Sequence, residues 1–164
     1  MNVDTIEKLF VDELKDLYSA ENQITKALPK LAKASTSEDL RTAFESHLGE
    51  TEEQIKRLEE IFTMLDVSPK GKTCVAMKGL LEEGSEVLED TQEGAVRDAA
   101  MISAAQRVEH YEMAGYGSVR TYAELLGQDE IVALLSETLE EEKSADSKLT
   151  EISKSINSKA LRAA

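Results

Sequence analysis

Tryptophan is absent from this 164-residue sequence, and aromatic residues make up only 4% of it. A buried core must therefore consist mainly of aliphatic side chains. Only two prolines and eight glycines interrupt the chain, so long helices can form with few breaks. The abundance of Ala, Leu, Glu and Lys favours the same fold class, all-α. Because this length suffices to bury a core, we expect residues 1–164 to form a single domain.

Cysteine and long apolar runs are also scarce. Cys74 is the only cysteine, which excludes a disulfide within the chain and is typical of a reducing compartment. No histidine or second cysteine is close to it in the sequence, so we expect a buried structural thiol. No transmembrane run, signal peptide or lipidation motif is recognisable. We therefore expect a soluble, cytoplasmic protein without a membrane partner.

Basic residues are outnumbered by acidic ones, 19 to 33, which gives a net charge of −14. Such a chain repels phosphate backbones, and no cluster of Lys and Arg stands apart from the surrounding acids. We therefore expect no nucleic-acid partner. The acidic field would attract cations, although solubility explains the charge equally well.

Apolar residues recur at spacings of three and four in four long segments, which predicts amphipathic helices that face a core. These segments are residues 3–33, 35–65, 93–126 and 129–156. A capping-box pattern at Ser35–Glu38 separates the first two, and Gly127 ends the third. Residues 74–88 form a shorter amphipathic segment in the long connection between the second and third. The residues after 156 are polar and are expected to fray.

Two glutamates interrupt the apolar stripe of the third segment. Glu109 and Glu112 lie one turn apart, between Ala105 and Tyr116 on the face that the stripe predicts to be buried. A carboxylate in a core costs several kcal/mol unless it is neutralised or bound to something. The pair therefore suggests a metal site.

The other long segments also carry ligand-type side chains on or beside the apolar stripe. They are Glu21 in the first segment, His47 and Glu50 in the second, and Glu142 and Asp146 in the fourth. The histidine is explained equally well as a hydrogen-bonded core residue. The acids that lie off the stripe of the fourth segment are expected to face solvent, and they are Glu137, Glu140 and Glu141.

The acids are level with one another in the two hairpins that short turns predict. Glu21 lies 14 residues before the first turn, at Ser35, and Glu50 lies 15 residues after it. At ~1.5 Å per residue, both are roughly 21–22 Å from that turn. Glu112 and Glu142 each lie 15 residues from the second turn. The spacing therefore predicts a single site at mid-height.

Two hairpins with level inward acids, joined by a long crossover, resemble the ferritin-like fold, which holds two iron or manganese ions. A carboxylate-rich donor set suits Fe or Mn better than Zn or Cu. We therefore predict an all-α, ferritin-like four-helix bundle of two antiparallel helical hairpins, with a short additional helix in the crossover. Two divalent metal ions, Fe or Mn, are the predicted cofactors.

Four short segments carry a more specific resemblance. They are His47-Leu-Gly-Glu-Thr51, Cys74-Val-Ala-Met77, Val108-Glu-His-Tyr-Glu112 and Leu139-Glu-Glu-Glu-Lys143. With nearly all of residues 2–155 around them, they resemble the YciF-type ferritin-like stress-response family of bacteria. The resemblance implies the ferritin-like fold and a cytoplasmic, stress-induced protein that forms a homodimer. It does not specify an activity.

The resemblance also implies a set of ligands. Glu21 takes the place of the first-helix ligand, and Glu50 and Glu142 take the glutamate places of the second-helix and fourth-helix Glu-x-x-His motifs. Glu109-x-x-Glu112 resembles the paired third-helix glutamates of the peroxidase-like rubrerythrins.

Two positions depart from the family pattern. Glu53 and Ala145 stand where each Glu-x-x-His motif has its histidine, and alanine cannot bind a metal. His47 and Asp146 are the candidates to substitute for the missing ligands. His110 is rotated by about 100° from Glu109 on the helix and is not expected to bind.

Two classes of function stay open at this stage. The first is a dimetal-carboxylate protein of the bacterial stress response that handles iron, oxygen or peroxide. The alternative is a non-catalytic helical scaffold or interaction protein, in which the inward acids are hydrogen-bonded to neighbouring side chains. The candidate partners in that case are Tyr18, His47, Gln54 and Tyr116.

Overall fold

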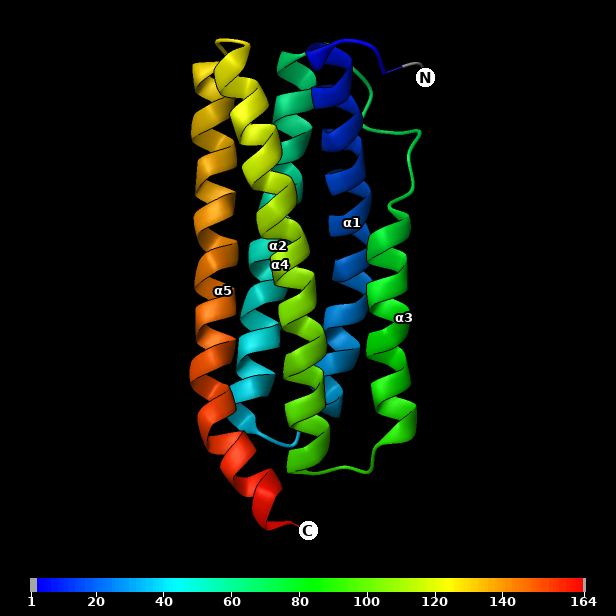
Figure 1. Cartoon of the computed structure of the whole chain (residues 1–164), viewed down its shortest axis with the longest axis vertical. Helices are drawn as coiled ribbons and strands as arrows, with labels where there is room; N and C mark the ends of the chain where they lie inside the picture. Colours follow the sequence, from blue (N-terminus) through cyan, green and yellow to red (C-terminus); the bar gives the residue numbers. More distant parts are fainter. Residues whose placement is uncertain (1–2, 164) are drawn as a thin grey trace.

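The chain folds into five α-helices in a computed structural model that describes residues 3–163. The helices are α1 (Ile6–Ala34), α2 (Glu38–Met64), α3 (Val75–Asp90), α4 (Ala95–Leu125) and α5 (Asp129–Arg162). Four long helices run side by side as a bundle, and the shorter α3 lies along its outside (Figure 1). This architecture confirms the predicted all-α, ferritin-like bundle with a short helix in the crossover.

The bundle consists of two antiparallel hairpins packed against each other. α1 pairs with α2, and α4 pairs with α5. Between the hairpins, α1 packs against α4 and α2 packs against α5, while α3 covers α1 and α4.

The prediction of fraying after residue 156 was wrong, because α5 continues to Arg162. Basic residues in its last turn interact favourably with the helix dipole there.

A buried carboxylate ties the first turn to the second hairpin. Asp98, in the first turn of α4, is 2% exposed. Its Oδ1 accepts a hydrogen bond from the Thr36 amide at 2.9 Å, and its Oδ2 accepts one from the Ser37 amide at 2.7 Å. Ser37 in turn is the N-cap of α2. Asp98 therefore links the start of α4 to the start of α2 at this end of the bundle.

The apolar core is divided into two clusters. The upper cluster, next to the α4–α5 turn, includes Phe10, Leu14, Leu17, Leu58, Phe62, Tyr116, Val119 and Leu135. The lower cluster, next to the α1–α2 turn, includes Ile24, Leu28, Leu40, Phe44, Met101, Ile102, Val108 and Leu149. On each of the four long helices, the residues between these clusters include buried polar side chains. We call this level the polar layer.

Cys74 is a buried free thiol, as expected. It is the N-cap of α3, and its Sγ accepts a hydrogen bond from the Met77 amide at 3.3 Å. Burial is the main cause that raises the pKa of this thiol, which lowers its thiolate fraction and its reactivity.

Within residues 3–163 no helix has the length and apolar character that a membrane span requires.

Candidate metal centre

Each of the four long helices contributes an ionisable side chain to the polar layer. These side chains are Glu21 from α1, His47 from α2, Glu109 and Glu112 from α4, and Glu142 from α5. All five residues are buried, with exposed fractions between 0% and 6%. Their burial follows from sequence, because each occupies a position in an apolar stripe whose neighbours pack in the upper or lower cluster.

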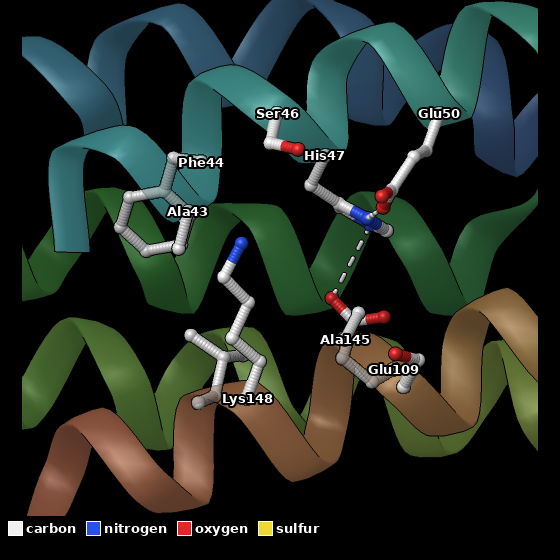
Figure 2. A pocket seen from close by; sticks show the side chains of 10 residues that line it. Ala43, Phe44, Ser46, His47, Glu50, Glu109, Ala145 and Lys148 are labelled. Atoms are coloured by element: carbon white, nitrogen blue, oxygen red, sulfur yellow. Dashed lines mark hydrogen bonds and ion pairs between the residues drawn. The ribbon is translucent and has the colours of Figure 1, made fainter. Parts of the chain in front are cut away.

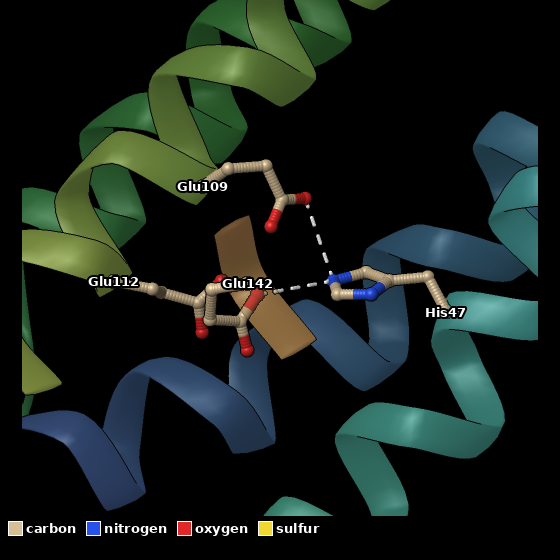
Figure 3. Close-up of side chains that lie close together, drawn as sticks. All are labelled: His47, Glu109, Glu112 and Glu142. Atoms are coloured by element: carbon tan, nitrogen blue, oxygen red, sulfur yellow. Dashed lines mark ion pairs between the residues drawn. The ribbon is translucent and has the colours of Figure 1, made fainter. Parts of the chain in front are cut away.

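His47 and three of the glutamates converge on one point (Figure 3). The Nε2 atom of His47 lies 3.4 Å from Glu109 Oε1 and 3.8 Å from Glu142 Oε2. Glu112 completes the group, and one ligand atom from each of the four residues lies within 4.8 Å of all the others. This arrangement could hold a metal ion, and we call these four residues the His47 cluster.

Glu21 borders the cluster and is held by a tyrosine. Its Oε1 accepts a hydrogen bond from the hydroxyl group of Tyr116, while its Oε2 has no hydrogen-bond partner. Burial raises the pKa of Glu21, and repulsion from Glu142 adds to this effect. Glu21 is therefore an additional carboxylate donor at the α1 side of the layer.

Most donor atoms of the polar layer have no hydrogen-bond partner in the protein. These atoms are Glu21 Oε2, His47 Nε2, Glu109 Oε2, and both carboxylate oxygens of Glu112 and of Glu142. Leaving one buried acceptor unsatisfied costs ~1–3 kcal/mol, and more when the group is charged. So many unsatisfied oxygens at one point are best explained by a cation. The residues present therefore fit a divalent metal ion.

The pKa values of the buried glutamates indicate that they hold protons more strongly than free glutamates when no cation is bound. Burial is the main cause that raises the pKa of Glu21 to about 8. It also raises the pKa values of Glu109, Glu112 and Glu142, and repulsion from neighbouring carboxylates adds to this for Glu109 and Glu112. A cation must therefore displace protons from these groups in order to bind.

The pKa of His47 is shifted in the opposite direction to that of an imidazole that is simply buried. Burial alone lowers its pKa, but the hydrogen bond to Glu50 and the attraction of Glu109, Glu142 and Glu21 raise it to about 10. These interactions favour the protonated form of the imidazole when no cation is bound. Binding of a metal to Nε2 requires the loss of that proton.

The two remaining predicted ligands, Glu50 and Asp146, lie outside the His47 cluster. The Glu50 side chain is 45% exposed, and its Oε2 lies 3.2 Å from His47 Nδ1. It can therefore fix the orientation of the ring that points Nε2 into the cluster. Asp146 accepts a hydrogen bond from Gln106 at 3.1 Å and lies 3.3 Å from His110 Nε2. The structure thus does not bring Asp146 together with the other acids.

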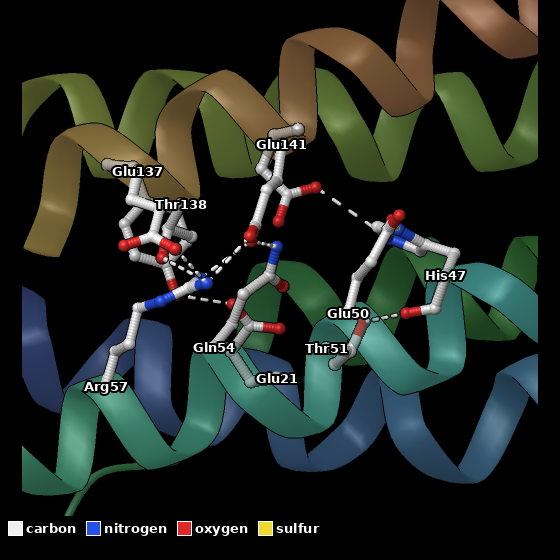
Figure 4. A network of polar contacts seen from close by, with 11 residues as sticks. Glu21, His47, Glu50, Thr51, Gln54, Arg57, Glu137, Thr138 and Glu141 are labelled. Atoms are coloured by element: carbon white, nitrogen blue, oxygen red, sulfur yellow. Dashed lines mark hydrogen bonds and ion pairs between the residues drawn. The ribbon is translucent and has the colours of Figure 1, made fainter.

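Sequence reasoning missed a network beside the site, between α2 and α5 (Figure 4). The Arg57 guanidinium binds both carboxylate oxygens of Glu141 at 2.7 Å. Gln54, fully buried, donates to the same carboxylate at 3.0 Å, while its own Oε1 has no partner. The prediction that Glu141 faces solvent was wrong, because the charge of Arg57 draws it into the interface between the helices. The available sequence signal was the position of Gln54, one turn after Glu50 and beside the apolar stripe of α2.

Comparisons with known proteins find similar sequences. Residues 5–162 match the family model described as Domain of unknown function (DUF892). The chain is 51% identical to Protein YciF of Escherichia coli K12 over 162 residues, which covers 98% of both chains.

Solved structures show the same relationship. The crystal structure of the E. coli stress protein YciF superposes with a TM-score of 0.92 at 49% identity, covering 96% of this chain and 99% of that one. YcfI of Rhodopseudomonas palustris gives a TM-score of 0.88 at 45% identity, covering 91% and 95%. A Xanthomonas campestris protein shares the fold at 19% identity, with a TM-score of 0.76 and coverage of 96% and 97%.

Proposed function

The chain belongs to the DUF892 family, which includes proteins similar to YciF, and on that premise we propose that its polar layer is a dimetal-carboxylate centre. The proposed ions are Fe(II) or Mn(II), bound at up to two per chain. The observation that carries this proposal is the set of buried carboxylate oxygens that have no hydrogen-bond partner.

The charge of the site supports two ions rather than one. Four buried glutamates carry four negative charges when ionised, and two divalent cations would neutralise them. The donor set contains one imidazole and otherwise carboxylates, which suits the harder ions Fe and Mn. Glu21 would hold an ion on the α1 side, and the His47 cluster would hold one on the α2 side.

The surrounding residues prepare the site for cations. Tyr116 holds one oxygen of Glu21 and leaves the other free. Glu50 accepts a hydrogen bond from the Nδ1–H group of His47 and so directs Nε2 inward. The upper and lower clusters exclude water from both sides of the polar layer, which strengthens every charge interaction within it. Bound Fe or Mn would supply redox chemistry toward oxygen or peroxide.

A role in the bacterial stress response follows from the similarity to the E. coli stress protein YciF. A centre that binds iron and reacts with oxygen or peroxide would suit that role. The alternative, a scaffold without metal chemistry, needs the inward acids to be satisfied by neighbouring side chains. Tyr116 does this for one oxygen of Glu21, but Tyr18 is hydrogen-bonded to Glu59 and Gln54 to Glu141.

Metal stoichiometry tests the proposal. Protein purified without chelators and then dialysed against Mn(II) or anaerobic Fe(II) should bind up to two ions per chain. Glu109→Gln and Glu142→Gln should each reduce the number of bound ions or their affinity by about tenfold or more, because each removes a charged donor. The measurement is elemental analysis, combined with equilibrium dialysis.

Glu140→Gln is the matched control for Glu142→Gln. Glu140 lies on the same helix, its side chain is 71% exposed and it pairs with Lys143, so metal binding should not change. Equal losses in the two variants would contradict the proposed site. A wild-type protein that binds neither metal would support the scaffold instead. Multiple turnovers of peroxide by the Fe-loaded protein would show catalysis, whereas a single stoichiometric oxidation would favour sequestration.

A further inference from the structure

A cavity of about 110 Å³ leads from the surface to the His47 cluster. It lies between α2 and α5, and its innermost lining includes His47 and Glu109 (Figure 2). Ala43, Phe44 and Leu149, all buried or nearly so, form apolar walls. One water molecule needs only ~10–15 Å³ of such space. The cavity therefore has room for a molecule of several heavy atoms that reaches the metal ligands.

The side chain at position 145, in the lining of this cavity, is small. Ala145 lines it and lies three residues after Glu142, so both side chains point from α5 toward the same side of the bundle. A ligand-type side chain at this position would fill the space and offer a donor to the centre. Alanine offers neither volume nor donor, so the centre has an open side here.

The outer rim of the cavity is polar and carries one cation. Exposed Ser46 and Ser144 contribute hydroxyl groups, and Lys148 contributes an ammonium group that extends from α5 toward α2 (Figure 2). Among residues 3–163, Lys148 forms no ion pair within 4.0 Å. The hydrogen bond from His47 is the main cause that lowers the pKa of Glu50, and the attraction of Lys148 adds to it. Glu50 and Glu109 are the two acids in the lining.

An unpaired lysine at the entrance does not suit a route for divalent cations, which it would repel. The ammonium group attracts an anion, although the carboxylates of Glu50 and Glu109 in the lining repel it. An anion therefore gains enough attraction only when metal ions neutralise the glutamates below it. The apolar walls limit its size, and the serine hydroxyls can donate hydrogen bonds to its oxygens.

We propose that this cavity binds a small carboxylate or oxyanion as an external ligand of the metal centre, on the side that Ala145 leaves open and with Lys148 as its counter-charge. This inference rests on the proposed metal centre. It assigns to the site a second kind of ligand, anionic and of a few heavy atoms, whose binding depends on prior metal binding.

Acetate titration of the Mn(II)-loaded protein in chloride-free buffer tests the inference. Acetate should raise the melting temperature in a saturable way and change the electron paramagnetic resonance spectrum of bound Mn(II), whereas the metal-free protein should show neither effect. Ala145→Leu should fill the cavity and weaken acetate binding by about tenfold or more. Lys148→Gln should weaken it by about two- to fivefold, the range for an exposed ion pair.

Lys143→Gln is the matched control, because Lys143 lies on the same helix and pairs with Glu140 outside the cavity. Bound Mn(II) is counted in every variant. Unchanged metal content together with weaker acetate binding in both cavity variants would support the inference. Acetate binding that is unaltered by Ala145→Leu or Lys148→Gln, or that is absent while Mn(II) is bound, would overturn it and leave the metal centre standing. If neither Mn(II) nor Fe(II) binds, both proposals fail.

Discussion

At the scale of single residues, Glu50 shows how a carboxylate can serve a metal centre without entering it. Its hydrogen bond to His47 Nδ1 fixes the imidazole that points into the cluster. We expect Glu50→Ala to weaken Mn(II) binding by about 10- to 100-fold, the usual cost of removing such a partner. Equilibrium dialysis measures the change, with Glu53→Ala as control because that side chain is 60% exposed and pairs with Lys56. Equal affinities in the two variants would show that His47 needs no orienting partner.

Sequence periodicity identifies buried positions well but does not determine the contacts of each side chain. Glu21, Glu109, Glu112 and Glu142 are buried as their apolar neighbours indicate, although their role as metal ligands stays a prediction. Asp146 follows Glu142 by one turn, and the stripe alone predicts the same environment for both.

In the structure, Asp146 pairs with Gln106 and His110 instead. A rotation of a few tens of degrees about the helix axis decides between these outcomes. Packing against α4 sets that rotation, and the sequence of α5 alone does not determine this packing.

At the scale of helices, Asp98 joins the two hairpins at one end of the bundle. Asp98→Ala removes the acceptor of two amide groups and should lower the free energy of unfolding by about 2 kcal/mol. Urea unfolding, followed by circular dichroism, measures this. Asp39→Ala is the control, since Asp39 is exposed in the first turn of α2 and contributes less than ~1 kcal/mol through the helix dipole. Equal destabilisation by the two changes would contradict a specific role for Asp98.

The turns within the two hairpins were predictable because they depend on local chemistry, whereas the end of α5 was not. The first turn lies at Ser35–Glu38 as predicted, but the N-cap of α2 is Ser37, and Ser35 of the expected capping box instead ends α1. The second turn contains the left-handed Gly127, with φ of 67°. The contacts of Asp98 and of Arg57 were not predictable, because each joins residues far apart in the sequence. Single-helix patterns give the buried face of a helix, whereas polar contacts between helices depend on how the faces meet.

At the scale of the whole molecule, crowded carboxylates should make the metal-free protein sensitive to pH. A glutamate whose folded pKa is raised, as for Glu21 from 4.5 to about 8, loses stabilisation as pH rises through that window. His47, raised from 6.5 to about 10, loses its stabilisation as pH rises between those values. Both groups therefore lower stability on going from pH 5.5 to 7.5. The net charge of −14 acts in the same direction.

Melting temperatures at pH 5.5 and 7.5, with chelator and with Mn(II), check this expectation. Wild type should lose more stability at pH 7.5 than Glu109→Gln/Glu142→Gln does, and should recover more when Mn(II) is added. Equal recovery in the double variant would mean that the ions bind elsewhere.

A cytoplasmic location, a homodimer and the lack of a nucleic-acid partner, all expected from the sequence, stay predictions.

The polar layer has a consequence for how the helices find their alignment during assembly. Apolar stripes alone allow neighbouring helices to slide by one turn, because leucine can replace leucine in a packed cluster. A slide of about 5.4 Å would here carry Glu21 or Glu142 into the upper or lower cluster and leave an apolar side chain among the remaining acids. Misaligned bundles are thereby penalised, whether or not a metal is present. The same acids that weaken the metal-free fold thus select one arrangement of it.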